Sequence, residues 1–345
     1  MRLFGLLLLL VTLFSCSDGR EPFSRVIIED FYQDSLSIRA IAPLDENRVW
    51  FAANAGIVGL VDHKVPKLAA IRYEDSLLHF RAIARTSTSV FVLSIANPGV
   101  LYKIGFDGKE ATEIVEVYTE EGEKVFYDAM AFWNDQEGIA MGDPTEGCLS
   151  VIVTRDGGNS WQKLSCDILP PAEEGEAAFA ASNSNIALVN DKVWIVSGGR
   201  RARVFYSEDK GNTWTVFETP ILQGGTMTGI YSVDFYDEQV GVIFGGNWEN
   251  KEFNEGNKAL TTDGGKTWKL LSNGEGPGYR SSVSFVPGTE GEGLVAVGSP
   301  GISYSSDQGE EWIELSSEGF YAIEFVNDTV AFASGRNRIS KLQFK

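Results

Sequence analysis

Four stretches of the sequence share one pattern without gaps: Thr154-Arg-Asp-Gly-Gly-Asn-Ser-Trp161, Ser207-Glu-Asp-Lys-Gly-Asn-Thr-Trp214, Thr261-Thr-Asp-Gly-Gly-Lys-Thr-Trp268 and Ser305-Ser-Asp-Gln-Gly-Glu-Glu-Trp312. Their aspartates are 53, 54 and 44 residues apart. An aspartate can hydrogen-bond the backbone of its own turn, and a glycine supplies a positive φ at low steric cost. A tryptophan directly after the turn places a large apolar side chain between packed layers. Each stretch therefore predicts a β-hairpin turn with structural residues: Asp156, Trp161, Asp209, Trp214, Asp263, Trp268, Asp307 and Trp312.

By these four stretches the protein resembles the Asp-box, or BNR, repeat β-propellers. That family includes sialidases and the photosystem II stability/assembly-factor-like propellers. In the family the box lies on the turn between the third and fourth strands of a blade, away from the central ligand face. The resemblance implies that the four aspartates are structural rather than catalytic.

A second repeat predicts the number of blades. Strands with apolar alternation, such as Val233 and Phe235, follow seven starting points: Arg39, Arg81, Asp128, Phe179, Tyr231, Ser281 and Tyr321. Units of about 40–50 residues have the length of propeller blades. The last unit has room for only three strands, and residues 25–31 (RVIIEDF) can supply the fourth. We therefore predict an all-β fold: one domain over residues 25–345, a seven-bladed β-propeller of four-stranded antiparallel blades, with the last blade closed by the N-terminal strand.

The amino terminus predicts export. Residues 1–15 place Arg2 before an apolar run that is too short to span a bilayer comfortably, as in a secretory signal peptide. The run ends in Leu13-Phe14-Ser15-Cys16, which resembles a bacterial lipobox, although Phe14 is an unusual occupant. The alternative is ordinary cleavage with Cys16 as an incidental thiol. We expect a lipid anchor on Cys16, a tether over residues 16–24, and a location in the bacterial cell envelope, facing the periplasm or the cell surface.

Two further cysteines flank the first aspartate turn. Cys148 lies six residues before Thr154, and Cys166 lies six residues after Ser160. The hairpin should place them nearly opposite each other, close to bridging range. Two arrangements remain open: a disulfide, which an oxidising compartment would favour, and a pair of reduced, packed cysteines.

The composition argues against several functions. The chain has 48 acidic and 29 basic residues, a net charge of −19, which opposes binding to nucleic acid. Two histidines leave little material for a histidine-rich metal site. Residues 291–296 match a dinucleotide-binding fingerprint, but they lie within a β repeat and open no helix. We expect no metal, no cofactor and no nucleic-acid partner.

The end of the channel opposite the aspartate turns should hold any ligand. The ligand-binding candidates there are Arg39, Arg81, Asp128, Arg200, Arg201, Tyr231, Arg280 and Tyr321. Arginine forks bind carboxylates with two hydrogen bonds, and Arg39 and Arg81 occupy the same repeat position. The alternative is a solvated rim of local salt bridges.

Two functions compete. The resemblance to assembly-factor-like propellers implies a non-catalytic, monomeric scaffold that binds a protein or peptide of the cell envelope and touches the membrane only through its lipid. The resemblance to sialidases implies a glycoside hydrolase for a carboxylated sugar, which needs an arginine triad, a tyrosine–glutamate pair and an acid. Ile38-Arg39-Ala40-Ile41 stands where that family has F/Y-R-I-P, and sialidases have six blades. We therefore favour the scaffold and assign no catalytic residue.

Overall fold

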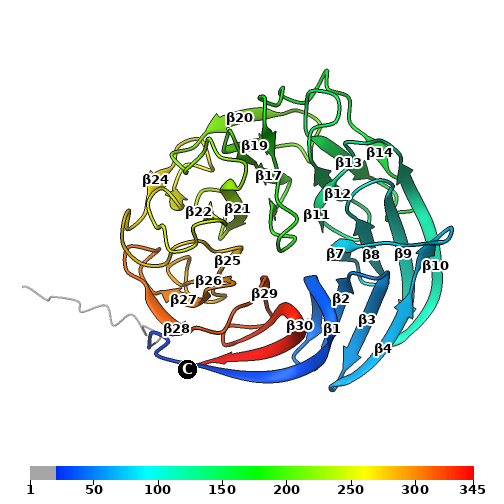
Figure 1. The fold of residues 1–345 in the computed structure, drawn as a ribbon, viewed down its shortest axis with the longest axis horizontal. Helices are drawn as coiled ribbons and strands as arrows, with labels where there is room; N and C mark the ends of the chain where they lie inside the picture. Colours follow the sequence, from blue (N-terminus) through cyan, green and yellow to red (C-terminus); the bar gives the residue numbers. More distant parts are fainter. Residues whose placement is uncertain (1–20) are drawn as a thin grey trace, which may run out of the picture.

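The protein folds as a ring of β-sheets around a central channel (Figure 1). The structure is a computed structural model, and it describes residues 21–345. Strands, turns and loops account for all of these residues, so the predicted all-β propeller is confirmed. The predicted signal peptide, the lipidation site Cys16 and residues 16–20 of the predicted tether lie outside the described residues.

Four of the sheets have four antiparallel strands each. The first contains β7 (Phe80–Arg85), β8 (Ser89–Ser94), β9 (Gly99–Asp107) and β10 (Glu110–Glu120). The second contains β11 (Tyr127–Phe132), β12 (Gly138–Gly142), β13 (Ser150–Thr154) and β14 (Gln162–Lys163). The third contains β16 (Ile186–Val189), β17 (Lys192–Val196), β19 (Arg203–Ser207) and β20 (Thr215–Glu218). The fourth contains β25 (Ser282–Phe285), β26 (Leu294–Gly298), β27 (Gly301–Ser305) and β28 (Ile313–Ser316).

Two sheets have six strands each, and a small hairpin stands apart. One large sheet contains β15 (Glu176–Ala177), β18 (Gly198–Gly199), β21 (Thr228–Phe235), β22 (Gly241–Asn247), β23 (Lys258–Thr261) and β24 (Lys269–Leu270). The other contains, in spatial order, β29 (Ala322–Phe325), β30 (Val330–Phe344), β1 (Val26–Asp45), β2 (Arg48–Ala53), β3 (Ile57–Asp62) and β4 (Val65–Ala70). The hairpin is formed by β5 (Arg72–Tyr73) and β6 (Ser76–Leu77).

The predicted number of blades is wrong. With each continuous sheet counted as one blade, the described residues form a six-bladed propeller, not seven four-stranded blades. The reason is strand β1, which runs for 20 residues and pairs on both sides. Its first part pairs with β30 (Val26 opposite Phe344) and its second part with β2 (Ala40 opposite Ala52), so the predicted first and seventh units share one sheet.

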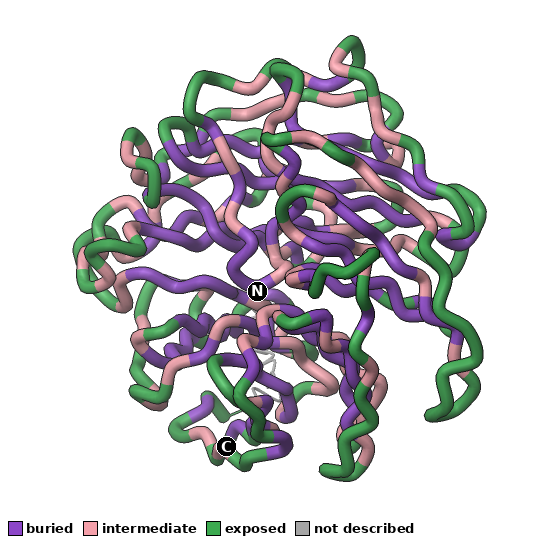
Figure 2. The backbone as a smooth tube through the Cα atoms, turned by 45° about the vertical axis from the view of Figure 1, so that its right-hand side comes forward, coloured by how far each residue is buried: buried purple, intermediate pink, exposed green. Residues whose placement is uncertain are grey.

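Apolar side chains fill the spaces between neighbouring sheets. Figure 2 shows that buried residues follow the sheets and that exposed residues gather at the loops. Trp161 illustrates the packing. Its indole lies edge-on to the rings of Phe91 and Phe132, with ring centres 6.3 and 5.7 Å away. Such contacts join one sheet to the next and hold the inner strands in place around the channel.

The four aspartate turns are held by hydrogen bonds to their own backbone. In the third, Asp263 Oδ1 accepts from the backbone nitrogens of Lys266 (3.1 Å) and Thr267 (2.9 Å), and Oδ2 accepts from Thr267 Oγ1 (2.7 Å). The glycine of each pattern has a φ between +74° and +89°. At Gly158 a Cβ would lie 2.1 Å from a ring carbon of Phe91, so both the backbone and the packing require glycine there.

The turns differ from one another in two details. Trp214, Trp268 and Trp312 each donate from Nε1 to the carbonyl oxygen of the turn glycine at 2.9 Å, whereas the buried Nε1 of Trp161 has no hydrogen-bond partner among the described residues. The fourth turn has Glu311 where the other three have a hydroxyl that donates to the aspartate. Asp307 therefore keeps the backbone hydrogen bond from Glu311 (3.0 Å) but lacks that side-chain bond.

Candidate functional site

A loop that we call the channel segment, residues 178–184, reaches into the middle of the ring (Figure 1). Asn183 donates from Nδ2 to the carbonyl oxygen of Ile83 (2.9 Å), and Ser182 donates from Oγ to the carbonyl oxygen of Ser281 (2.6 Å). Two other sheets of the ring therefore hold this loop in place. The prediction that an inner strand begins at Phe179 is wrong, because β16 begins only at Ile186.

Two arginines reach the channel segment from neighbouring inner strands. Arg39 on β1 donates from Nη1 to the carbonyl oxygen of Ala181, and Arg81 on β7 donates from Nη1 to that of Ala180, both at 3.3 Å. The guanidinium carbon of Arg39 also lies 4.1 Å from the centre of the Tyr321 ring. The shared repeat position thus brings the two positive charges to neighbouring residues of the channel segment.

Neither arginine forms an ion pair with a carboxylate in residues 21–345, although both are half-buried. Burial lowers the pKa of Arg81 to about 10, and the charge of Arg39 adds to the effect, against Asp128 and Tyr321. Arg81 Nε instead contacts Nε2 of His79 (3.3 Å). Burial and the two arginines lower the pKa of His79 to about 4, so the imidazole is neutral at pH 7 and can accept this hydrogen bond.

The two guanidinium groups line a cavity of about 380 Å³, which we call the arginine pocket. Its other wall is aromatic: the rings of Phe179 and Tyr231 are parallel, with centres 3.9 Å apart, and the ring of Tyr279 stands edge-on to Tyr231 at 4.8 Å. Part of the lining is open to solvent, because Trp248 is 48% and Met227 is 40% exposed. The pocket can therefore receive an anion that carries an apolar group.

A second cavity of about 820 Å³, which we call the acidic groove, adjoins the arginine pocket. The two share Phe126, Asp143 and Ala177 as lining residues. The exposed side chains of Glu123, Glu173 and Glu174 line the groove, with Lys124 as its one basic residue. Burial raises the pKa of Asp143 to about 6, against a hydrogen bond from the backbone of Ala178. Positive and negative potentials thus lie next to each other on one surface.

A disulfide holds one wall of the acidic groove. Cys148 and Cys166 are joined by an S–S bond of 2.01 Å, so of the two arrangements left open by the sequence the structure contains the bridge. Cys148 also pairs with Pro171 through a backbone bridge. These links hold the chain just before Ala172 and Glu173, which line the groove.

A third cavity, of about 430 Å³, lies along the inner strands beyond Arg39 and Arg81 and is lined by Asn183 and Ser184 of the channel segment. It contains two carboxyl groups. Burial raises the pKa of Glu324 to about 8, with Asp234 adding to the shift and Arg85 opposing it. Burial also raises the pKa of Asp234 to about 6, against hydrogen bonds from Phe285, Phe235 and Ser284. Carboxyl groups with raised pKa values thus lie on the far side of the channel segment from the arginine pocket.

The structure brings together only part of the predicted set. Arg39, Arg81 and Tyr231 line the arginine pocket, and Tyr321 packs on Arg39. Asp128 is fully buried, and burial raises its pKa well above the usual range, with Asp143 adding to the effect and Arg81 opposing it. Asp128 therefore interacts electrostatically with Arg81 from a buried position and is not a contact for a ligand.

Three predicted arginines lie outside the arginine pocket. Arg280 is 4% exposed and donates to Ser303 Oγ (2.9 Å) and to the carbonyl oxygen of Tyr279 (2.9 Å). Arg201 faces solvent near Glu218, at 3.9 Å, and Arg200 is also exposed. The prediction that all of these residues share one site is therefore too broad.

Some of the pocket was missed from the sequence. The interpretation of Phe179 as the start of a strand concealed its place in the aromatic wall. Met227, which lines the pocket, and His79, which contacts Arg81 beside it, are not among the predicted residues. A signal for the loop was present in the run Ser182-Asn-Ser-Asn185, because serine and asparagine favour turns. No local signal places Met227 in the cavity.

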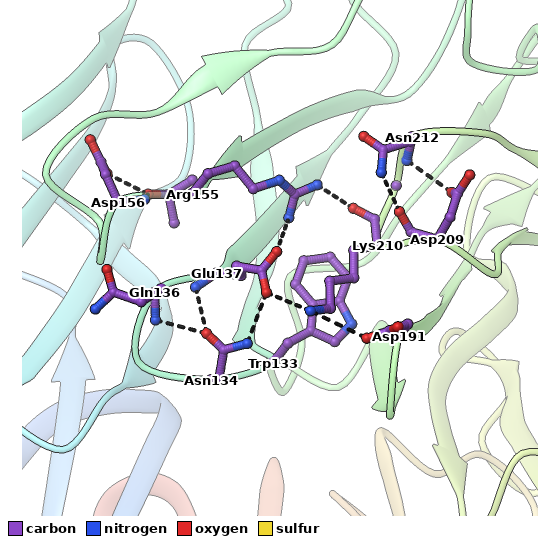
Figure 3. Close-up of polar contacts among 12 residues, drawn as sticks. Trp133, Asn134, Gln136, Glu137, Arg155, Asp156, Asp191, Asp209, Lys210 and Asn212 are labelled. Carbon is purple, nitrogen blue, oxygen red and sulfur yellow. Dashed lines mark hydrogen bonds and ion pairs between the residues drawn. The ribbon is translucent and has the colours of Figure 1, made fainter.

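The aspartate-turn end has its own charged cluster, drawn in Figure 3. Arg155 lies over the ring of Trp133 at 5.5 Å and forms an ion pair with Glu137 at 3.7 Å. Lys210 also pairs with Glu137 and, at 3.2 Å, with Asp191. These charges compensate one another across two sheets, so the cluster is structural.

Two features are absent from the described part of the chain. Residues 21–345 contain no group of three or more histidine, cysteine or acidic side chains placed to hold a metal ion. No helix with the length and apolarity needed to cross a bilayer occurs in the same residues.

Solved structures with the same fold are numerous. YCF48 bound to D1 peptide superposes with a TM-score of 0.67 at 12% identity, over 95% of this chain and 99% of that chain. YCF48 from Cyanidioschyzon merolae gives 0.60 at 13% identity, over 93% and 98%. The GH74 xyloglucanase from Xanthomonas campestris gives 0.64 at 12% identity, over 92% of this chain and 53% of that one.

Sequence comparison adds no relative. No protein-family model matches the chain. A search of curated proteins likewise finds no match. At these levels of identity the structural likeness shows the fold, and the protein is a β-propeller similar to YCF48 and to other propellers of different activity.

Proposed function

We propose that the protein is a non-catalytic scaffold that binds a protein or peptide partner at the arginine pocket. The observation that carries this proposal is the pair Arg39 and Arg81, two half-buried positive charges without a carboxylate partner beside an open aromatic cavity. A charge held away from water without an opposite charge is unfavourable. A bound carboxylate would supply that charge.

The existing contacts of the two guanidinium groups leave room for such a ligand. Each donates to a carbonyl oxygen at 3.3 Å, which is longer than a good N–H···O hydrogen bond. Carboxylates form shorter and stronger bonds with guanidinium groups, often two at once. The likeness to YCF48 bound to D1 peptide supports a peptide as the partner.

The finer family assignment is part of the same proposal. The backbone hydrogen bonds and positive φ values that the four turns share support this assignment. We assign the protein to the Asp-box propellers of the assembly-factor-like kind, exported and anchored through Cys16. Labelled palmitate should enter the wild-type protein but not a Cys16→Ala variant; equal labelling of the two would remove the anchor from the proposal.

The arrangement of side chains disfavours a sialidase-like hydrolase. The count of six blades removes one argument against that function, so the decision rests on the arginines. Arg280 is buried against Ser303 and does not line the pocket that contains Arg39 and Arg81. Asp128 is inaccessible, and Tyr279 is 3% exposed. The triad and the acid are therefore not assembled, and we expect no turnover of a fluorogenic sialoside.

The proposal is tested by crosslinking and pull-down of the tethered protein from intact membranes. A double variant, Arg39→Gln/Arg81→Gln, should lose an envelope partner that the wild type captures. Arg201→Gln is the matched control, because this exposed arginine lies outside the pocket. An unchanged set of captured proteins in the double variant would overturn the proposal.

A further inference from the structure

We infer that the arginine pocket and the acidic groove together bind the C-terminal end of a peptide that has a large apolar last residue and basic residues before it. This inference rests on the proposed function and deepens it by naming the chemistry of the partner. The terminal carboxylate meets Arg39 and Arg81, the last side chain meets the aromatic wall, and the preceding residues lie along the acidic groove.

The arginine pair selects a carboxylate. The two guanidinium groups reach the same channel segment from neighbouring strands, so both can contact one small anion. The buried Nε of Arg39 has no hydrogen-bond partner among the described residues. A planar carboxylate has two oxygens for these donors and supplies the negative charge that the pair lacks.

The shape of the pocket favours the C-terminal end of a bound peptide over an internal segment. Ala180 and Ala181, the residues that the arginines contact, belong to the channel segment, which separates the pocket from the cavity beyond it. An extended chain that enters with its carboxylate against the arginines therefore ends there. The volume of about 380 Å³ suits one large side chain with its terminal carboxylate, and the parallel rings of Phe179 and Tyr231 offer it an apolar surface.

The acidic groove favours basic residues in the part of the peptide that precedes its last residue. It joins the pocket through Phe126, Asp143 and Ala177, and exposed acidic side chains outnumber Lys124 on its surface. The protein as a whole carries a net charge of −19, so a purely acidic peptide would be repelled on approach. A peptide with basic residues upstream is attracted by the groove while its carboxylate is held by the arginines.

Fluorescence anisotropy with labelled peptides tests the inference on the purified protein, residues 21–345. The reference peptide is fluorescein-Gly-Ser-Lys-Lys-Ser-Gly-Phe with a free carboxylate. Three others change one feature each: a C-terminal amide, alanine in place of phenylalanine, and two glutamates in place of the lysines. We expect the amide to bind at least about tenfold more weakly, since it loses charge-assisted hydrogen bonds. The alanine peptide should lose about tenfold by its smaller apolar area, and the glutamate peptide about threefold or more.

Two protein variants assign these effects to their residues. Arg39→Gln should reduce the preference for the acid over the amide, whereas Arg201→Gln should leave that preference unchanged. A Glu173→Gln/Glu174→Gln variant should reduce the preference for lysines over glutamates and leave the preference for the acid intact.

The outcomes separate this inference from the proposed function. Equal binding of the acid and the amide, or no binding of the reference peptide, overturns the inference. If the Arg39→Gln/Arg81→Gln protein still loses its envelope partner in that case, the scaffold function stands with a different ligand, such as an internal acidic side chain. If the partner is retained as well, both fail.

Discussion

At the aspartate-turn end of the ring, Arg155 and Lys210 both pair with Glu137, whereas at the opposite end the partners of Arg39 and Arg81 within residues 21–345 are carbonyl oxygens, an imidazole and an aromatic ring. The first arrangement is complete without any other molecule. The second leaves both guanidinium groups without an ion pair among the described residues, although the buried Asp128 attracts the charge of Arg81. Basic side chains at one end of the ring are paired and stabilise the fold. At the other end, basic side chains of the same kind keep an unpaired charge, which is unfavourable until a ligand of opposite charge binds.

The largest effect should come from the disulfide beside the acidic groove. A Cys148→Ser/Cys166→Ser variant should lower the free energy of unfolding by about 3 kcal/mol, the value for a loop of similar length to the 18-residue separation here. It should also weaken peptide binding, because the wall of the groove loses its covalent link. Urea denaturation and anisotropy measure the two effects. A stability equal to that of the wild type would show that hydrogen bonds alone hold this wall.

The aspartate turns should come next. Asp263→Ala should lower the free energy of unfolding by about 2 kcal/mol, because it leaves two backbone donors and two hydroxyls without their acceptor. Asp307→Ala should cost about 1 kcal/mol less, since Asp307 accepts from one hydroxyl, that of Ser305, and has no hydroxyl donor at position 311. Neither change should alter peptide binding. Equal losses at the two sites would contradict the role given to the hydroxyl.

The two kinds of arginine should respond differently to the same substitution. Arg155→Gln should lower the free energy of unfolding by up to about 1 kcal/mol, in line with a partly exposed ion pair. Arg81→Gln should leave it unchanged or raise it, because the substitution removes repulsion from Arg39. Thermal unfolding of both variants at pH 7 and low salt measures the contrast. A clear loss of stability in Arg81→Gln would mean that its charge is already compensated.

The smallest stability effect should be a gain in the fourth turn. Glu311→Thr supplies the hydroxyl that the other turns have, and it should raise the free energy of unfolding by about 0.5–1 kcal/mol. Urea denaturation against the wild type measures it. A matched substitution at an exposed position outside the turns, Glu292→Thr, controls for the loss of one negative charge.

The pH dependence of stability should also differ between the turns and the channel. Burial raises the pKa of Asp263, but hydrogen bonds from Thr267, Thr261 and Lys266 outweigh it and lower the pKa overall, so its stabilisation is lost as the pH falls. Glu324 is the opposite case: its pKa rises to about 8 on folding, so the folded state binds the extra proton and stability falls as the pH rises from about 4.5 to 8.

Glu324→Gln tests the channel half of that contrast. The variant should unfold at a higher temperature than the wild type at pH 9, and the difference should shrink towards zero near pH 4.5. Asp234→Asn should show the same sign over a lower and narrower range, because its folded pKa is about 6. A difference that grows as the pH falls would contradict the direction of the shift.

The sequence predicts the local parts of this molecule well and the non-local parts less well. The turn around Asp263 is specified within eight residues, so the pattern alone predicts its geometry. The number of blades depends on β1 pairing on both of its sides, including with residues more than 300 positions away, and no local pattern shows this.

The same distinction applies to the site. The sequence predicts Arg39 and Arg81 as site residues because the repeat places them at equivalent points on neighbouring strands. Arg280 occupies a similar position in the repeat, just before β25, but its side chain is hydrogen-bonded to Ser303 on β27, two strands away in the same sheet. The direction of a long side chain is decided by what packs beside it, and the sequence of its own strand does not contain that information.

The joining of the two chain ends has a consequence for how the protein is made. Residues 26–33 pair with residues 338–344, and the backbone of Lys345 is hydrogen-bonded to that of Arg25. The first part of β1 therefore stays unpaired until β30 has been synthesised, although its second part can already pair with β2. Until then the ring has open sheet edges that can pair with other chains. A nascent protein of this design must be protected from pairing with other chains until its synthesis is complete. A chain that ends a few residues early loses the strand pairing that closes the ring.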